Sequence, residues 1–312
     1  MEKLGHARIA MIGFPSVGKS TMLNVLTNTA SEAASYEFTT LTCIPGFIFH
    51  NDAKIQLLDL PGIIEGAASG KGRGKQVIAV GKSADLIMMV LDTQKGEEQK
   101  AKLTLELESV GIRLNEERPL INVKHTQKGG IMVNCTVKRT LMDDKMIKNI
   151  LFEYKMHNAH IVMRGDYSVD QFIDAIEGNR KYVRCLYVYN KIDTVSIEDV
   201  DELARLPNTT VISSGMKLGL DLLKEQMWDM LNLVRVYTKK KGSPPDLQDP
   251  LILTRGRGGY TVKAAIMQIH KALKDSFKCG YVWGKSAKHN PQKVGLDHPL
   301  EDEDVLQIMK KG

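Results

Sequence analysis

The sequence predicts an α/β fold with a largely parallel sheet, because patterns typical of strands and of helices alternate from residue 7 onward. The first apolar run, Ala7–Ile12, is followed by a glycine-containing loop and then by a helical pattern at residues 21–26. Apolar runs of strand length recur at residues 55–59, 85–92 and 185–189. Runs of this kind are typical of strands that are buried on both faces, so we expect helices on both sides of the sheet.

The loop after the first run has the form Gly-x-x-x-x-Gly-Lys-Ser, at residues 13–20. Between a strand and a helix, its backbone N–H groups and the positive end of the helix dipole point into one concavity, which suits phosphate groups. Lys19 is expected to reach the outer phosphates, and the Ser20 hydroxyl to bind Mg²⁺. The alternative is a turn without function, which fits this context less well. The predicted nucleotide-binding residues of this loop are Gly13, Pro15, Ser16, Val17, Gly18, Lys19, Ser20 and Thr21.

Two further segments fit the same chemistry. Asp59 ends an apolar strand and begins an Asp-Leu-Pro-Gly sequence, so we expect Asp59 to hold Mg²⁺, directly or through water, and the Gly62 N–H to meet a γ-phosphate. Between this segment and the glycine loop, Thr40 is our choice for a hydroxyl that closes on Mg²⁺, with Thr39 as the adjacent alternative. A plain strand would also be rich in threonine. We assign catalytic roles to Lys19, Thr40 and Gly62.

The segment Asn190-Lys191-Ile192-Asp193 follows another apolar strand and predicts specificity for guanine. The Asp193 carboxylate can accept hydrogen bonds from the N1–H and the N2 amino group of guanine, which adenine cannot supply. A loop at residues 211–215 is placed to support the guanine O6 through backbone N–H groups, so Ser213, Ser214 and Gly215 join Asn190, Lys191 and Asp193 as predicted binding residues. The four segments together predict a GTP-binding and GTP-hydrolysing protein. A kinase that uses ATP is a distant alternative.

Positive charge is concentrated in the last quarter of the chain. Residues 234–312 hold 15 Lys and Arg against 8 Asp and Glu, which leaves 28 against 29 for residues 1–233. This imbalance predicts a polyanionic partner for the C-terminal part. The alternative is a lysine-rich surface that is merely solvated.

The sequence also indicates where the protein is located and whether its cysteines and histidines bind metal. We see no charged-then-apolar leader, and the apolar runs are far too short to span a bilayer, so we expect a cytoplasmic protein without a membrane partner. The four cysteines form no Cys-x-x-Cys pair, which favours free thiols over a disulfide framework or a zinc site. His157 and His160 lie three apart on a predicted helix, but no further ligands gather near them.

The chain divides into three predicted domains. The interval from residue 92 to residue 190 is too long for one strand–helix step, and it holds helical patterns at residues 95–110 and 144–154 and a strand pattern at residues 131–137. We therefore predict a small α+β insertion at residues 111–178 within a nucleotide domain at residues 1–110 and 179–233. Residues 234–312 form a third, α+β domain, with a basic, turn-rich stretch at 237–245 and a helix whose apolar face runs from Val262 to Leu273. Short strands are expected at residues 251–253, 281–284 and 305–308.

The strings at residues 13–20, 36–46, 59–67, 185–193 and 282–284 closely resemble those of the developmentally regulated GTP-binding proteins, in the Obg group of translation-factor-class GTPases. This resemblance covers essentially the whole chain. It implies a P-loop GTPase domain with a Ras-like parallel or mixed sheet, an insertion like domain 2 of ribosomal protein S5, and a C-terminal TGS domain of β-grasp type. It also implies association with ribosomes or rRNA and a dedicated regulatory protein with a zinc-finger region. Relatives carry a helical segment before the first strand, where this sequence has six residues; nothing indicates an obligate homo-oligomer.

The sequence departs from the Ras-like pattern where water is activated. Ras-like enzymes place Gln directly after Asp-x-x-Gly, whereas this chain has Ile63, which cannot orient water by hydrogen bonding. Obg-like relatives share this hydrophobic substitution, and some use K⁺ beside the phosphates, typically with Asn where this chain has Ser16. Ser16 still offers an oxygen for such an ion. We therefore expect slow hydrolysis and hold K⁺ stimulation as a hypothesis.

Residues 62–74 hold five glycines with Lys71 and Arg73 between them and Lys75 just beyond, which predicts a switch segment that is ordered by GTP or a partner. These basic side chains could contact rRNA or the phosphates of the nucleotide. The least favoured of these possibilities is that Arg73 acts as an internal arginine finger. The alternative is a surface segment without such a role. Two functions stay open for the chain. One is a GTPase switch that cycles on the ribosome, and the other is an RNA-binding scaffold whose nucleotide site only stabilises the fold.

Overall fold

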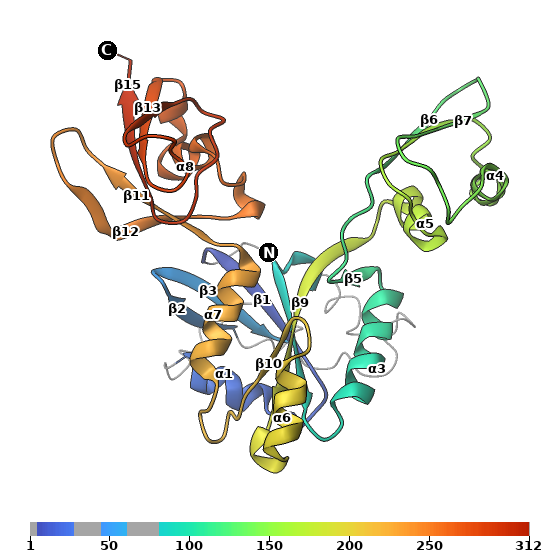
Figure 1. Cartoon of the computed structure of the whole chain (residues 1–312), viewed down its shortest axis with the longest axis horizontal. Helices are drawn as coiled ribbons and strands as arrows, with labels where there is room; N and C mark the ends of the chain where they lie inside the picture. Colours follow the sequence, from blue (N-terminus) through green and yellow to red (C-terminus); the bar gives the residue numbers. More distant parts are fainter. Residues whose placement is uncertain (1–4, 28–44, 61–80, 312) are drawn as a thin grey trace, which may run out of the picture. The chain divides into compact units, whose positions relative to one another are not determined.

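The computed structural model describes residues 5–27, 45–60 and 81–311, and it divides into two compact units. One unit comprises Met1–Glu106 with Arg184–Gly312, and the other is Leu107–Val183, here called the insertion. The first unit holds a main sheet and a separate C-terminal module, residues 234–311, with a sheet of its own (Figure 1). Among the described residues, no helix combines the length and the apolar character that crossing a membrane requires.

The main sheet has the strand order β10-β9-β4-β1-β3-β2. Its strands are β1 (Ala7–Ile12), β2 (Pro45–His50), β3 (Ala53–Asp59), β4 (Leu86–Asp92), β9 (Lys181–Asn190) and β10 (Thr209–Val211). All neighbours are parallel except β2, which is antiparallel to β3, and the short β5 (Ile112–Leu114) pairs in parallel with the first residues of β9. The predicted α/β class with a parallel or mixed sheet is confirmed.

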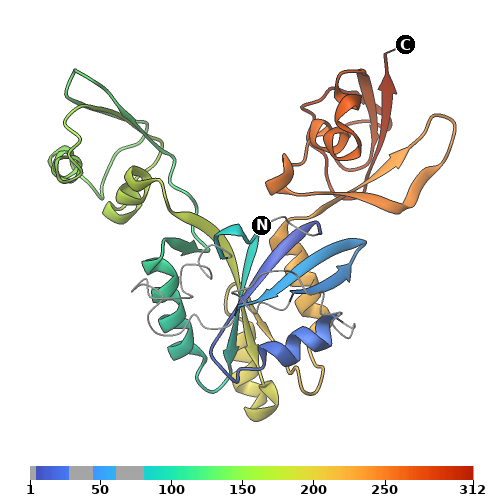
Figure 2. The same ribbon diagram turned by 180° about the vertical axis from the view of Figure 1, so that it is seen from behind.

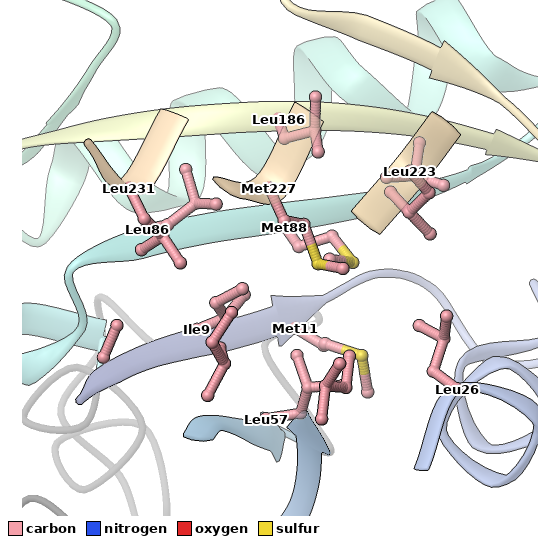
Figure 3. Close-up of a cluster of buried hydrophobic side chains, with 14 of the residues drawn as sticks. Ile9, Met11, Leu26, Leu57, Leu86, Met88, Leu186, Leu223, Met227 and Leu231 are labelled. Carbon is pink, nitrogen blue, oxygen red and sulfur yellow. The ribbon is translucent and has the colours of Figure 1, made fainter. Parts of the chain in front are cut away.

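Helices cover both faces of the main sheet (Figures 1 and 2). They are α1 (Lys19–Thr27), α3 (Gly96–Ser109), α6 (Ile197–Ala204) and α7 (Leu220–Leu231), with the 3₁₀ turn η1 (Ile192–Thr194). On one face, α1 and α7 pack on β1, β3, β4 and β9 through side chains such as Leu26, Met11, Leu57, Met88 and Met227, all of them buried (Figure 3). Each such side chain stabilises the fold by about 1.5–3 kcal/mol relative to exposure, so this core fixes the strands whose ends carry the site.

The insertion is a three-stranded sheet, in the order β6-β8-β7, with two helices. Its elements are β6 (Ile121–His125), β7 (Ile131–Cys135), α4 (Asp144–Glu153), β8 (Ala159–Met163) and α5 (Val169–Glu177). Ile147, Leu151, Ile161 and Phe172 form the centre of its core. A helix through His157 and His160 was the wrong prediction: His160 lies in β8, where pairing with β6 and β7 overrides local helix propensity. The proposed domain boundaries and the likeness to ribosomal protein S5 stay predictions.

The C-terminal module is a five-stranded sheet in the order β12-β11-β15-β13-β14. Its elements are β11 (Val234–Lys239), β12 (Pro245–Leu253), η2 (Arg255–Arg257), α8 (Val262–Ile269), η3 (Lys271–Lys274), β13 (Phe277–Trp283), β14 (Gln292–Val294) and β15 (Asp304–Lys310). Helix α8 packs on one face of this sheet, where Val262 and Ile266 meet Val236, Val282 and Leu306. The module is therefore a two-layer α+β unit.

Two predictions within this module are corrected. The stretch 237–245, expected to be turn-rich, lies in β11 up to Lys239 and in β12 from Pro245 on, because the two strands form an antiparallel hairpin around residues 240–244. The helix expected to run from Val262 to Leu273 ends at Ile269. His270 takes an extended conformation, and its side chain accepts a hydrogen bond from the Ala272 N–H, which starts the separate turn η3.

Candidate nucleotide-binding site

The candidate site lies at the carboxyl edge of the main sheet. Because β1, β3, β4 and β9 are parallel, their last residues meet at one edge, which is where α/β proteins bind ligands. The glycine loop follows β1, Asp59 ends β3, Asp92 ends β4, and Asn190 ends β9. The sheet thus gathers segments that are far apart in the sequence.

Two glycines of the loop occupy positions that no larger residue fits. A Cβ at Gly13 would lie 2.4 Å from the backbone oxygen of Val90 in β4. Gly18 has φ +93°, and a Cβ there would lie 2.3 Å from the side-chain nitrogen of Asn190. Ser16 also has a positive φ, 64°, which a non-glycine residue adopts at some cost. The loop is therefore built against the strand that carries the predicted guanine segment.

Lys19 and Asp59 lie at the centre of the phosphate end. The Lys19 ammonium donates to the backbone oxygens of Gly13 and Phe14, at 2.7 and 2.8 Å. Burial lowers the pKa of Lys19, and the Asp59 charge acts the other way. Burial raises the pKa of Asp59, against the effects of the Lys19 charge and the Ser20 hydrogen bond. The two side chains therefore stabilise each other's charge in a partly desolvated place.

Ser20 and Asp59 fit the ligand preference of Mg²⁺. The Ser20 hydroxyl donates to Asp59 Oδ2 at 3.4 Å, which sets a hydroxyl and a carboxylate oxygen side by side. Mg²⁺ prefers hard oxygen ligands and commonly takes one or two from the protein, so this pair suits it. Among residues 5–27, 45–60 and 81–311, no cluster of three or more His, Cys, Asp or Glu side chains could hold a metal ion.

Asn190 links the glycine loop to the predicted guanine pocket. Its buried side chain donates to the Val17 backbone oxygen at 2.8 Å and accepts from the Ser214 N–H and hydroxyl at 2.9 and 3.0 Å. Every polar group of the amide thus has a structural partner. The role of Asn190 is to hold two loops in register.

Asp193 is positioned by the 211–215 loop. It lies in η1 after Lys191, whose backbone has φ 69°. The Asp193 carboxylate accepts from the Ser213 hydroxyl at 2.6 Å, and the Ser213 oxygen accepts from the Met216 N–H at 3.2 Å. Asp193 is exposed, so its second oxygen side stays accessible to a ligand.

Two residues of the site were missed by reasoning from the sequence. Asp92 accepts from the Lys191 ammonium at 2.8 Å, and the Thr93 hydroxyl donates to the Lys191 backbone oxygen at 3.1 Å. Burial would raise the pKa of Asp92, but the hydrogen bond from Lys191 and further favourable contacts hold it below the ordinary value. The available signal was the position of Asp92 at the carboxyl end of a buried strand.

Several predicted residues are not brought into this network. Thr21 and Pro15 are exposed, and a Cβ added to Gly215 would meet nothing within 4 Å. Thr39, Thr40, Gly62, Ile63 and the glycine-rich stretch at 62–74 lie outside the described residues. The predicted roles of all these residues stay predictions.

Comparisons with known proteins agree with this arrangement. Residues 8–125 match the family described as "50S ribosome-binding GTPase", residues 128–233 match the "C-terminal region of MMR_HSR1 domain", and residues 234–310 match the TGS domain. Developmentally-regulated G-protein 2 of Arabidopsis thaliana is 59% identical over 309 residues, which are 99% of this chain and 77% of that protein. Developmentally-regulated GTP-binding protein 2 of Homo sapiens is also 59% identical, over 99% of this chain and 84% of its own length.

The chain belongs to the developmentally regulated GTP-binding protein family. Its C-terminal module is a TGS domain, and its main sheet belongs to a P-loop GTPase domain. Among solved structures, the G domain of FeoB from Methanococcus jannaschii is similar over 73% of this chain and 98% of its own, at 18% identity and a TM-score of 0.39. That likeness is distant, and the assignment of this developmentally regulated GTP-binding protein rests on the sequence matches.

Proposed function

We propose that this protein is a cytoplasmic, Mg²⁺-dependent GTPase that works as a switch on the ribosome. The observation that carries the proposal is the edge of the main sheet, where the glycine loop, Asp59 and the segment 190–193 converge. A site that had decayed to a structural role would have no need of Lys19, Ser20, Asp59 and Asp193 together. The family that matches residues 8–125 is named for binding the 50S ribosome, which supports the setting.

The phosphate end has defined tasks for its residues. Lys19 leaves the carbonyls of Gly13 and Phe14 for the outer phosphates, whose charge replaces those two hydrogen bonds. Ser20 and Asp59 would hold Mg²⁺, which would neutralise charge on the phosphate oxygens. The loop N–H groups and the start of α1 complete the cradle. Thr40 and Gly62 are our candidates for sensing the γ-phosphate.

The base end is proposed to select GTP over ATP. Asp193 offers its free carboxylate edge to two donors of guanine, while Ser213 holds the carboxylate in place. Binding adenine would leave that carboxylate without donors, which is costly. Asp92 and Thr93 hold Lys191 and its backbone beside the base.

Hydrolysis is slow in this proposal, because Ile63 stands where Ras-like enzymes use Gln. Ser16 would offer an oxygen to a K⁺ ion, which would supply the missing charge stabilisation. Association with the ribosome or rRNA, and a zinc-finger-containing regulatory protein, complete the proposed cycle. The second candidate is a scaffold on the ribosome, favoured by the positive charge of the TGS domain.

The guanine site is tested by Asp193→Asn. We expect the variant to lose about 100-fold or more in affinity for labelled GDP. The carboxylate accepts hydrogen bonds from two N–H donors of guanine, whereas the amide NH₂ of Asn is itself a donor and is repelled by one of them. Xanthosine diphosphate carries an acceptor at position 2, so it should bind the variant better than the original protein. Fluorescence titration with labelled GDP, ADP and xanthosine diphosphate measures all three affinities.

Asp199→Asn on the exposed helix α6 is the matched control, because it removes one negative charge nearby without touching the site. Its GDP affinity should be unchanged. Equal affinities for GDP and ADP in the original protein would contradict the assignment of the base site.

A further inference from the structure

Helix α8 packs on one face of the TGS sheet. Val236, Leu306 and Val282 point toward α8, as their place in the core shows. Side chains alternate along a strand, so their neighbours point to the opposite face. This opposite face is the subject of the inference, and we call it the aromatic face.

The aromatic face is defined by the strand register. Tyr237, Val305 and Trp283 form one row across β11, β15 and β13. Gln307, Tyr281 and Lys293 form the next row, across β15, β13 and β14. All three aromatic side chains are half-buried, so part of each ring is accessible.

Positive charge lies among these rings. The Lys239 ammonium lies 5.7 Å from the centre of the Trp283 ring, and it also donates to the Ser243 backbone oxygen at 2.5 Å. Lys293 is exposed at the end of the second row. Of the acidic residues just before and at the start of β15, Asp302 and Glu303 pair with Arg235, and Asp304 is buried. Asp246 and Asp249 are exposed on the edge strand β12.

We infer that the aromatic face binds unpaired RNA bases by stacking, with Lys239 and Lys293 on the flanking phosphates. Aromatic rings flanked by lysines are typical of single-strand binding surfaces. The bases stack on the rings, and the lysines contact the phosphates that link the nucleotides. The module's 15 basic residues against 8 acidic ones provide the charge complementarity. Duplex RNA offers only backbone and groove, so it gains nothing from the rings.

This inference deepens the proposed association with the ribosome, and it depends on that association only for its biological setting. The test uses a fluorescein-labelled, 12-nucleotide single-stranded RNA and the full chain, with anisotropy as the readout. Two comparison ligands are a blunt-ended duplex RNA, which has no unpaired bases, and an abasic strand of equal length. Trp283→Leu and Tyr281→Leu remove rings but keep apolar bulk, and thermal unfolding shows that each variant is folded.

We expect each ring variant, and the abasic strand, to weaken binding at least about tenfold. Lys239→Gln should weaken binding and reduce the salt slope by about 0.7, the value for one phosphate contact of a single strand. The matched control is Lys263→Gln, an exposed lysine on α8 at the other face of the module, and it should change binding by less than about twofold.

Three results would overturn the inference. The first is no binding of the strand below about 100 µM, a level typical of non-specific contacts. The second is equal binding of the abasic strand or the duplex RNA, and the third is unchanged binding by both ring variants. Ribosome co-sedimentation that is lost in Trp283→Leu while no RNA binds would point to a protein on this face instead. GTP hydrolysis and sedimentation of the original protein are measured separately, so a failure here is distinguishable from a failure of the proposed function.

Discussion

At the scale of single residues, burial and charge have opposite effects on the two ionised side chains at the phosphate end of the site. Burial disfavours both the Lys19 cation and the Asp59 anion, and each is the main charged group that favours the other. Folding positions these groups before any phosphate or metal arrives. Ligand binding then gains from charges that have already been desolvated in part.

The raised pKa of Asp59 makes Mg²⁺ binding dependent on pH. Asp59 in the folded protein holds a proton at a pH where an ordinary carboxyl, with a pKa of 3.8, has lost it. The pKa of Asp59 is higher in the folded than in the unfolded protein. The folded state therefore loses stability as pH rises through the folded pKa and the carboxylate ionises. Mg²⁺ bound to the carboxylate would offset that loss. As pH falls toward the raised folded pKa of Asp59, protons compete with Mg²⁺, and we expect the Mg²⁺ concentration that half-maximally slows GDP release to rise.

The measurement is release of labelled GDP over a Mg²⁺ series at several pH values. Asp59→Asn is the control, since the GDP phosphates titrate equally in both proteins. We expect the pH effect to be about two- to tenfold larger with Asp59 than with Asn. Identical pH profiles for the two proteins would contradict the raised pKa.

At the scale of elements, the insertion depends on one buried carboxylate. Asp174 of α5 accepts two hydrogen bonds from Arg113, at 2.8 and 3.0 Å, one from Arg180 at 3.1 Å and one from the Tyr182 hydroxyl at 3.2 Å. These contacts join α5 to β5 and β9. Burial would raise the pKa of Asp174, but the hydrogen bond and charge of Arg113 lower it below the ordinary value. Burial, with the Asp174 charge, raises the pKa of Tyr182 to about 12.

Asp174→Asn should destabilise the insertion by about 3 kcal/mol, because it leaves Arg113 without its buried counter-charge, although Arg180 keeps its pair with Glu177. The carboxylate's contribution is full above the unfolded pKa near 3.8, and it is lost as pH falls through the lower folded pKa. Hydrogen exchange within residues 107–183 measures the effect locally. Asp144→Asn, which breaks the exposed pair with Arg139, is the control and should cost less than about 1 kcal/mol. Equal effects of the two variants would contradict the account.

Sequence patterns predicted elements well where one signal dominated. The buried strands of the main sheet were found from their apolar runs, although Arg8 in β1 is fully buried and bonds to Gln56 and Ser83, which no periodicity indicates. Helix α5 went unpredicted although Ser168 and Gln171 form a capping box, a signal that was present in the sequence. His160 and Tyr237 were misplaced because strand pairing with distant segments decides their conformation.

At the scale of the whole molecule, the motifs predicted which residues meet because a parallel sheet brings strand ends together. The sequence motifs therefore predicted Lys19, Asp59 and Asn190 to be members of one site. They missed Asp92, whose role depends on a hydrogen bond across two strands rather than on a motif. The charge imbalance indicated a polyanionic partner, but only the register of the TGS strands placed the aromatic side chains on one face.

The most direct test of the central claim is steady-state GTP hydrolysis by the full chain, in KCl and in NaCl at equal ionic strength, with and without ribosomes. Lys19→Ala is the control, because it removes the cation that meets the phosphates. We predict slow hydrolysis that is about several-fold faster in K⁺ than in Na⁺ and that is abolished in the variant. Tight GTP binding without turnover under any of these conditions would contradict the switch and favour the scaffold.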